Sequence, residues 1–197
     1  MIDKSKLTKR QAIVFDQVRN LYETSQRKTA KWLWNHHVQI VGENCLRLAH
    51  KYNGDADLSF AGALLHDLGD VWLERKDPQF TSRSKKKAKE ILKNADFSTE
   101  EINDVLENII GPHSCRDGNL PTLLEGKILA TADAIAHLQT NFYYDFKKMG
   151  LPDHIQPEEF STWVSEKLER DFNTKIFFDE IREEVKHNYE KLKGDLR

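Results

Sequence analysis

The chain has 197 residues, of which 31% are charged, and its 30 basic and 32 acidic side chains leave a formal net charge of -2. This balance lacks the large basic excess of a dedicated nucleic-acid-binding domain. No stretch approaches the ~20 apolar residues that a membrane helix needs, and the polar N-terminus has no apolar leader core. We therefore expect a cytoplasmic protein that forms one domain over residues 1–197.

Apolar residues at helical spacing dominate the first part of the chain, and strand-like alternation is hard to find. Two amphipathic helices are predicted, one over about 13–22 and one over about 40–49. Their apolar stripes consist of Ile13, Val14, Val18, Leu21 and Tyr22, and of Ile40, Val41, Cys45, Leu48 and Ala49. A third helix is predicted from Asp57 to Leu68, where an almost wholly apolar sequence indicates burial and Gly69 can end the helix. The pattern predicts an all-α helical bundle.

Capping signals mark the start of two further helices. Ser98 with Glu101, and Thr122 with Glu125, have capping-box spacing. In such a box the hydroxyl and the carboxylate satisfy free N–H groups at the helix start.

The remaining segments are connections and C-terminal helices. Gly111-Pro112 breaks the chain and residues 115–121 are rich in turn formers, so His113 is expected just beyond a helix end. A loop is predicted over about 147–156, followed by packing helices over about 157–193. The last of these helices is expected to pack on the core; the alternative is a second copy of the chain, which would give a homodimer.

Three segments place ionisable side chains where the sequence predicts an apolar core. His66 and Asp67 directly follow the apolar run of the third helix. His37 shares a helix face with Val41, and Asp133 is flanked by small and apolar residues. Burying an ionised group costs several kcal/mol unless it is paired or bound to a metal, so these residues indicate a shared partner.

Each of these residues also has a purely structural interpretation. His37 could be a hydrogen-bonded core histidine, and Asp133 could pair with Lys127 or His137. That interpretation must be invoked separately for each residue, whereas one cation satisfies all of them. Two imidazoles and two carboxylates suit a single Mn²⁺, Fe²⁺, Co²⁺, Ni²⁺, Mg²⁺ or Zn²⁺ ion and leave positions open for water and a substrate oxygen.

The order of these residues resembles the HD-domain family of metal-dependent phosphohydrolases. In that family a histidine opens one helix, a His-Asp pair ends a later one and a distant aspartate completes the set; here these are His37, His66-Asp67 and Asp133. The sequence Ala-Leu-Leu-His-Asp-Leu-Gly at residues 63–69 also matches the family's pattern. The resemblance covers roughly 34–138 and implies an HD-type helical domain with these residues as metal ligands.

Within the family, the sequence is similar to a small bacterial and archaeal single-domain subgroup. The shared features are Asp70, His113-Ser114 and Glu125-Gly126-Lys127-Ile128. This subgroup looks like nucleotide phosphohydrolases, including nucleoside triphosphate pyrophosphohydrolases. Thr131 departs from it, because the subgroup often carries another aspartate there. His113 is the only further histidine between Asp67 and Asp133, which favours one metal over two.

Four other residues are candidates for catalysis and substrate binding. Asp70 could orient or deprotonate the attacking water, and His113 could donate to a phosphate or protonate the leaving oxygen. Arg75 and Lys76 are the basic residues nearest to the metal motif and could bind a phosphate. The structural alternatives are a solvated carboxylate, an exposed loop histidine and a solvated charged surface.

The leading functional prediction is metal-dependent hydrolysis of a phosphate ester or anhydride in a nucleotide or nucleotide-like small molecule. One alternative is a phosphodiesterase that acts on a cyclic nucleotide or a nucleic acid, although the weak net charge argues against a polymer. Another is a non-catalytic regulatory module that keeps a metal for stability. Retention of the four ligand residues together with Asp70 favours catalysis.

Overall fold

The computed structural model describes residues 2–150 and 155–196, and these residues contain helices but no β-strand, as predicted. The α-helices are α1 Lys9–Thr24, α2 Lys28–Leu33, α3 Gln39–Tyr52, α4 Ala56–Leu65, α5 Phe80–Asn94, α6 Thr99–Asn103, α7 Leu124–Leu138, α8 Phe142–Met149, α9 Phe160–Asn173 and α10 Asp179–Asp195. The shorter segments are the 3-10 turns η1 Lys4–Lys6, η3 Leu68–Val71 and η5 Pro157–Glu159, and the π-helical η2 Trp34–Val38 and η4 Asp104–Ile110.

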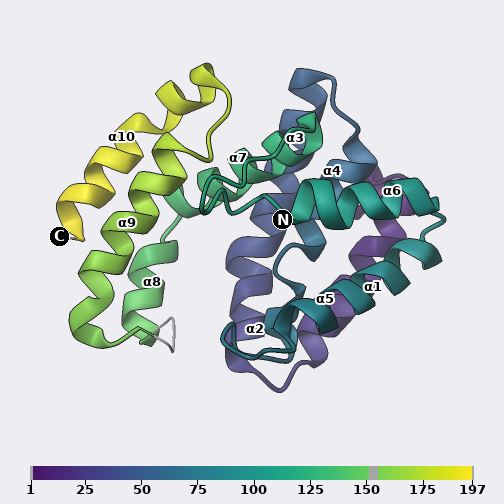
Figure 1. Ribbon diagram of the computed structural model, residues 1–197, viewed down its shortest axis with the longest axis horizontal. Helices are drawn as coiled ribbons and strands as arrows, with labels where there is room; N and C mark the ends of the chain where they lie inside the picture. Colours follow the sequence, from purple (N-terminus) through teal and green to yellow (C-terminus); the bar gives the residue numbers. More distant parts are fainter. Residues whose placement is uncertain (1, 151–154, 197) are drawn as a thin grey trace.

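Helices α3, α4 and α7 contact one another and form the centre of the molecule (Figure 1). On one side α1 packs on α4 and on α5, and on the other side α9 and α10 pack on α7 and on each other. Helix α4 is buried from Ser59 to Leu65, which explains why its sequence is apolar on every face. None of the described helices is long and apolar enough to cross a membrane.

A π-helical segment joins α2 to α3 and carries the first predicted ligand. The chain runs from α2 through η2 into α3 without leaving helical structure, and His37 lies inside η2. A π segment inserts an extra residue into a turn, and such segments frequently occur at functional sites. The His37 side chain is 1% exposed, as its position on the apolar face predicts.

The third predicted helix ends earlier than the sequence suggested. Helix α4 stops at Leu65, with His66 as its C-cap, and Gly69 belongs to η3 instead of ending the helix. A Cβ at Gly69 would lie 2.6 Å from Phe80 Cζ and 2.6 Å from Ser84 Oγ. Gly69 is therefore needed for the close approach of α5 to the turn that follows α4.

One of the two predicted capping boxes is confirmed and the other is wrong. Ser98 accepts a hydrogen bond from the backbone of Glu101, and the Glu101 side chain accepts one from the backbone of Ser98. Helix α7 instead begins at Leu124 without a side-chain cap. The Glu125 carboxylate accepts a hydrogen bond from the backbone N–H of Asp55 at 2.9 Å, so it fixes the loop before α4 instead.

The C-terminal part contains one helix that the sequence did not predict. Helix α8 extends to Met149 and so takes up the start of the loop predicted over 147–156. Residues 151–154 of that loop lie outside the described residues. Helix α10 packs its apolar stripe on α7 and α9, with Ile181 and Val185 fully buried, as the core-packing prediction required.

Candidate metal centre

Two buried hydrogen bonds from α1 and its C-cap hold the turn that carries His66 and Asp67. The Tyr22 hydroxyl donates to the backbone carbonyl of Asp67 at 2.9 Å, and Ser25 Oγ donates to the carbonyl of Val71 at 2.7 Å. Both carbonyls belong to the tight turn after α4, where helical hydrogen bonding has ended. Helix α1 thus helps to set the backbone from which the ligand candidates project.

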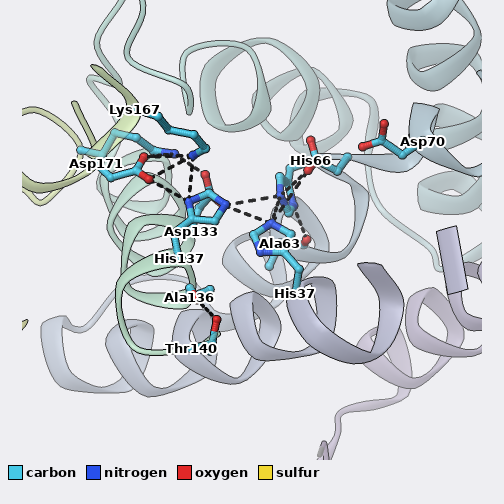
Figure 2. A network of polar contacts seen from close by, with 12 residues as sticks. His37, Ala63, His66, Asp70, Asp133, Ala136, His137, Thr140, Lys167 and Asp171 are labelled. Carbon is cyan, nitrogen blue, oxygen red and sulfur yellow. Dashed lines mark hydrogen bonds and ion pairs between the residues drawn. The ribbon is translucent and has the colours of Figure 1, made fainter. Parts of the chain in front are cut away.

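The structure brings together the four side chains that the sequence predicted as metal ligands. His37 Nε2 lies 3.2 Å from His66 Nε2 and 3.2 Å from Asp133 Oδ1. Asp67 Oδ2 lies 3.4 Å from His66 Nε2 and 3.8 Å from His37 Nε2. All four residues are at most 7% exposed. Figure 2 shows His37, His66 and Asp133 pointing toward one another from separate helical segments.

These separations fit a shared cation. Two ligand atoms bound at about 2.1 Å to one ion stand about 3 to 3.5 Å apart. One ligand atom each from His37, His66 and Asp133 lies within 4.8 Å of the others, so this buried group could hold a metal ion. Asp133 Oδ1 is buried and accepts no hydrogen bond from a described residue. His66 Nδ1 donates to the carbonyl of Ala63 at 2.7 Å, which leaves Nε2 as the ring nitrogen that faces the other ligand candidates.

The charge states of the two acids also suit a cation. Burial alone raises the pKa of Asp67, but Arg75 and His66 outweigh this effect and hold it well below its usual range. Burial likewise raises the pKa of Asp133, and His137 and Lys175 reverse the effect. Burial lowers the pKa of His37. Two carboxylates and a neutral imidazole are the forms in which these groups bind metals.

The sequence profile of the HD domain matches residues 35–138, which is more than half of the chain. The chain belongs to the HD-domain family. The matched stretch begins two residues before His37 and includes His66, Asp67 and Asp133. HD domains are typically metal-dependent phosphohydrolases, and the buried cluster suggests the same class here. No curated protein and no solved structure matches the chain significantly.

Residues outside the matched stretch hold one ligand candidate of this HD domain in place. Lys175 Nζ donates to Asp133 Oδ2, so the free oxygen of that carboxylate is the one that faces the two histidines. Thr131 Oγ1 donates to the carbonyl of Lys175 at 3.2 Å and accepts from the backbone of Phe177 at 3.1 Å. Thr131, which departs from the resembled subgroup, therefore fixes the segment that carries Lys175.

A second buried network lies behind Asp133 and was not predicted from the sequence. Asp171 Oδ2 lies 3.0 Å from His137 Nδ1 and 3.0 Å from Lys167 Nζ (Figure 2). It also accepts a hydrogen bond from the Tyr143 hydroxyl at 2.6 Å. The His137 ring stacks on the His37 ring at 4.8 Å between centroids and 6° between planes. His137 Nε2 also lies 3.5 Å from Asp133 Oδ1. The contact between Asp133 and His137 that the sequence suggested is therefore present, next to the candidate metal ligands. Burial lowers the pKa of His137 to about 3.

Asp67 and Asp70, two acidic residues of the turn after α4, both contact Arg75. Arg75 Nη2 lies 2.5 Å from Asp67 Oδ2 and 2.5 Å from Asp70 Oδ2, and Arg75 Nε lies 3.3 Å from Asp70 Oδ1. Asp70 is 6% exposed, so the alternative prediction that it is a solvent-exposed carboxylate is wrong. Burial raises the pKa of Asp70, although Arg75 opposes the shift. Arg75 thus links Asp70, the candidate general base, to Asp67, a candidate metal ligand.

His113 also lies at the centre and is not an exposed loop histidine. Its ring meets the His66 ring edge-on at 5.3 Å between centroids. Its Nδ1 donates to the carbonyl of Ile110 at 2.5 Å, which leaves Nε2 as the free ring nitrogen. Burial lowers the pKa of His113 to about 4, so the ring is neutral at pH 7.

A cleft of about 540 Å³ adjoins this centre. His66, Asp67, Asp133 and His113 line it, as do the two predicted phosphate-binding residues, Arg75 and Lys76. Helix α9 contributes Arg170 and the aromatic ring of Trp163 to the lining of the cleft. Sequence analysis did not assign this helix a role in the site, because a basic residue on an amphipathic helix has the same pattern as one on a solvated face.

Proposed function

We propose that this HD domain binds one divalent metal ion through His37, His66, Asp67 and Asp133 and hydrolyses a phosphate ester or anhydride in a nucleotide or nucleotide-like small molecule. The observation that carries the proposal is the buried Asp133 Oδ1, which has no hydrogen-bond donor although it lies 3.2 Å from His37 Nε2. A buried carboxylate oxygen without a donor costs free energy that a cation would recover. When bound, such an ion supplies Lewis acidity and lowers the pKa of a water.

Asp70 and His113 are the proposed catalytic residues. Asp70 accepts a proton from the attacking water, a role that suits a buried carboxyl whose pKa is raised. Arg75 orients Asp70 through two of its nitrogen atoms. His113 lies on the loop side of the cleft, and the negative charge of a bound phosphate raises the pKa of its ring, so that Nε2 takes up a proton and donates to a phosphate oxygen or to the leaving oxygen.

The substrate class follows from the size and charge of the cleft. A volume of about 540 Å³ lies within the range of about 300 to 1,000 Å³ that small-molecule sites occupy. Lys76 lines this cleft without an acidic partner among the described residues and is proposed to contact a phosphate, with Arg75 beside it. These features support a compact phosphorylated molecule over a polymer.

Segments on both sides of the matched stretch contribute to this site, which supports a single functional domain over residues 1–197. Tyr22 in α1 holds the turn of Asp67, and Lys175 after α9 holds Asp133. Neither residue belongs to the stretch that matches the HD domain.

A hydrolysis screen tests the proposal. The metal-stripped protein is resupplied with one divalent metal at a time and incubated with nucleoside mono-, di- and triphosphates, while released phosphate and pyrophosphate are both measured. We expect hydrolysis with at least one metal and its loss in His66→Ala. The matched control is His187→Ala, since His187 is exposed on α10 and should retain full activity. Equal activity in both variants, or no hydrolysis under any condition, would contradict the proposal.

A further inference from the structure

Among the residues that the structure describes, eight lysine and arginine side chains line the cleft, and they fall into two groups. Four of them form ion pairs with acids of the chain: Arg75, Lys85, Lys167 and Lys175. The others form no ion pair with any residue that the structure describes: Arg27, Lys76, Arg116 and Arg170. A basic residue without an acidic partner is free to bind an anionic ligand.

Two members of this second group, Arg116 and Arg170, come from distant segments of the chain and line the same cleft. Burial lowers the pKa of Arg116, and the positive charges of Arg170 and Arg75 lower it further. The Nε atom of Arg170 is buried and donates no hydrogen bond to a described residue. The cleft thus has two guanidinium groups in its lining that lack an acidic partner among the described residues. An anion bound by both would offset the cost of placing two positive charges in one cleft.

The backbone around Arg116 is specialised. Cys115 and Asp117, the residues on either side of it, both have left-handed conformations, with φ of 50° and 52°. Residues other than glycine rarely adopt this conformation, and such strained positions are often found at ligand-binding sites. Cys115 is buried and anchors the turn, while Arg116 lines the cleft. The turn formed by residues 115–117 therefore presents Arg116 to the cleft.

We propose that Arg116 and Arg170 form an anion subsite that binds a second phosphate group of the substrate, apart from the phosphate that is hydrolysed. The proposal rests on the proposed function, because it places the reacting phosphate beside His66 and Asp133 and the second phosphate beside Arg116 and Arg170, which line the same cleft. A planar guanidinium can bind two phosphate oxygens at once, which favours this role for two arginines. The substrate class is then a molecule with at least two phosphate groups.

Binding measurements test the subsite without relying on turnover. The affinities of the full-length protein for inorganic phosphate, pyrophosphate and tripolyphosphate are measured by calorimetry, with a chelator present and again with the metal that supports hydrolysis. We expect the wild type to bind tripolyphosphate more tightly than phosphate. Arg116→Gln and Arg170→Gln should each weaken tripolyphosphate binding roughly tenfold, while phosphate binding changes little.

Two further variants separate the subsite from general effects of charge and folding. Arg47→Gln removes the same charge from an exposed position of α3 that does not line the cleft, and its affinities should match the wild type. Arg170→Lys keeps the charge but loses the planar two-point contact, so its affinity should fall between those of Arg170→Gln and the wild type. Thermal unfolding of each variant verifies the fold.

The outcomes separate the subsite from the proposed hydrolysis. Unchanged tripolyphosphate binding in Arg116→Gln and Arg170→Gln, an equal loss in Arg47→Gln, or no tripolyphosphate binding by the wild type would each overturn the subsite. A normal binding pattern without hydrolysis of any phosphate compound would contradict the proposed function and leave the anion subsite in place.

Discussion

Lys175 donates a hydrogen bond to Asp133 although the two residues are 42 positions apart and only Asp133 belongs to the stretch that matches the HD domain. The contact uses one oxygen of the carboxylate and leaves the other toward His37. Lys175 Nζ also lies 3.6 Å from Asp171, so one buried cation neutralises two buried acids. The segment after α9 therefore controls the orientation of a proposed metal ligand.

Replacement of Lys175 should affect both stability and metal affinity. In Lys175→Met, Asp133 and Asp171 lose a buried partner, a change that costs about 3 to 5 kcal/mol of the free energy of unfolding. Because the orientation of Asp133 is no longer fixed, metal affinity should fall roughly 10- to 100-fold. Chemical unfolding and metal titration measure the two effects. Lys191→Met, at an exposed position of α10, is the control; unaltered metal affinity in Lys175→Met would refute this role.

The hydroxyl of Tyr22 should stabilise the turn that carries Asp67. Tyr22→Phe removes the hydroxyl that donates this 2.9 Å hydrogen bond, while the Asp67 carbonyl keeps the 3.0 Å hydrogen bond from the Asp70 N–H. We expect a loss of about 0.5 to 1.5 kcal/mol in the free energy of unfolding, the net value of one hydrogen bond. Tyr144→Phe removes a hydroxyl that contacts Asp195 at an exposed position, so its effect should be much smaller. Equal effects in urea unfolding would show that the buried contact has no special value.

Gly69 should tolerate no side chain. A Cβ in Gly69→Ala meets Phe80 and Ser84 at 2.6 Å, and the forced shift of α5 should cost about 1 to 3 kcal/mol of stability. The matched control is Gly194→Ala in α10, where nothing lies within 4 Å of the new Cβ. Alanine is a better helix former than glycine, so this control should gain up to about 1 kcal/mol. The same sign for both substitutions in thermal unfolding would be inconsistent with close packing at Gly69.

Lys167 should make stability depend on pH in the alkaline range. Burial lowers its pKa from 10.5 to about 8, with Asp171 opposing and Lys175 adding to the shift. Between these two pH values the unfolded chain binds more protons than the folded chain, so the free energy of unfolding rises with pH. Lys167→Met should remove this contribution, because the variant keeps Asp171, His137 and Lys175 but lacks the titrating group. Urea unfolding at pH 8, 9 and 10 measures how the free energy of unfolding changes with pH. An identical pH dependence in the wild type and Lys167→Met would contradict this role of Lys167.

The ligand candidates could be predicted from sequence because they conflict with their surroundings. His66 and Asp67 follow an apolar run, and Asp133 lies among small residues, so each position signals a buried polar group. The structure brings these residues together with His37. The all-α fold could also be predicted from the sequence, because the apolar stripes have helical spacing.

The supporting residues could not be predicted, because their surroundings are set by contacts between distant segments. Asp171 and Lys175 are four residues apart near the end of an amphipathic helix, a pattern that ordinarily indicates a solvated ion pair. Their burial depends on α7 and on the turn after α9. The predicted capping box of Thr122 and Glu125 was wrong for a similar reason, since Glu125 accepts a hydrogen bond from the backbone of Asp55, 70 positions away.

The amount of divalent metal bound per chain tests the central claim most directly. Wild type, His37→Ala, Asp133→Ala and the control His50→Ala are dialysed against each candidate metal, and the bound metal is quantified by elemental analysis. His50 is exposed on α3, so its replacement should not matter. We predict one ion per chain for the wild type and His50→Ala, with most of it lost in the other two variants. Full occupancy in His37→Ala and Asp133→Ala, or no uptake by the wild type, would contradict a metal centre at these residues.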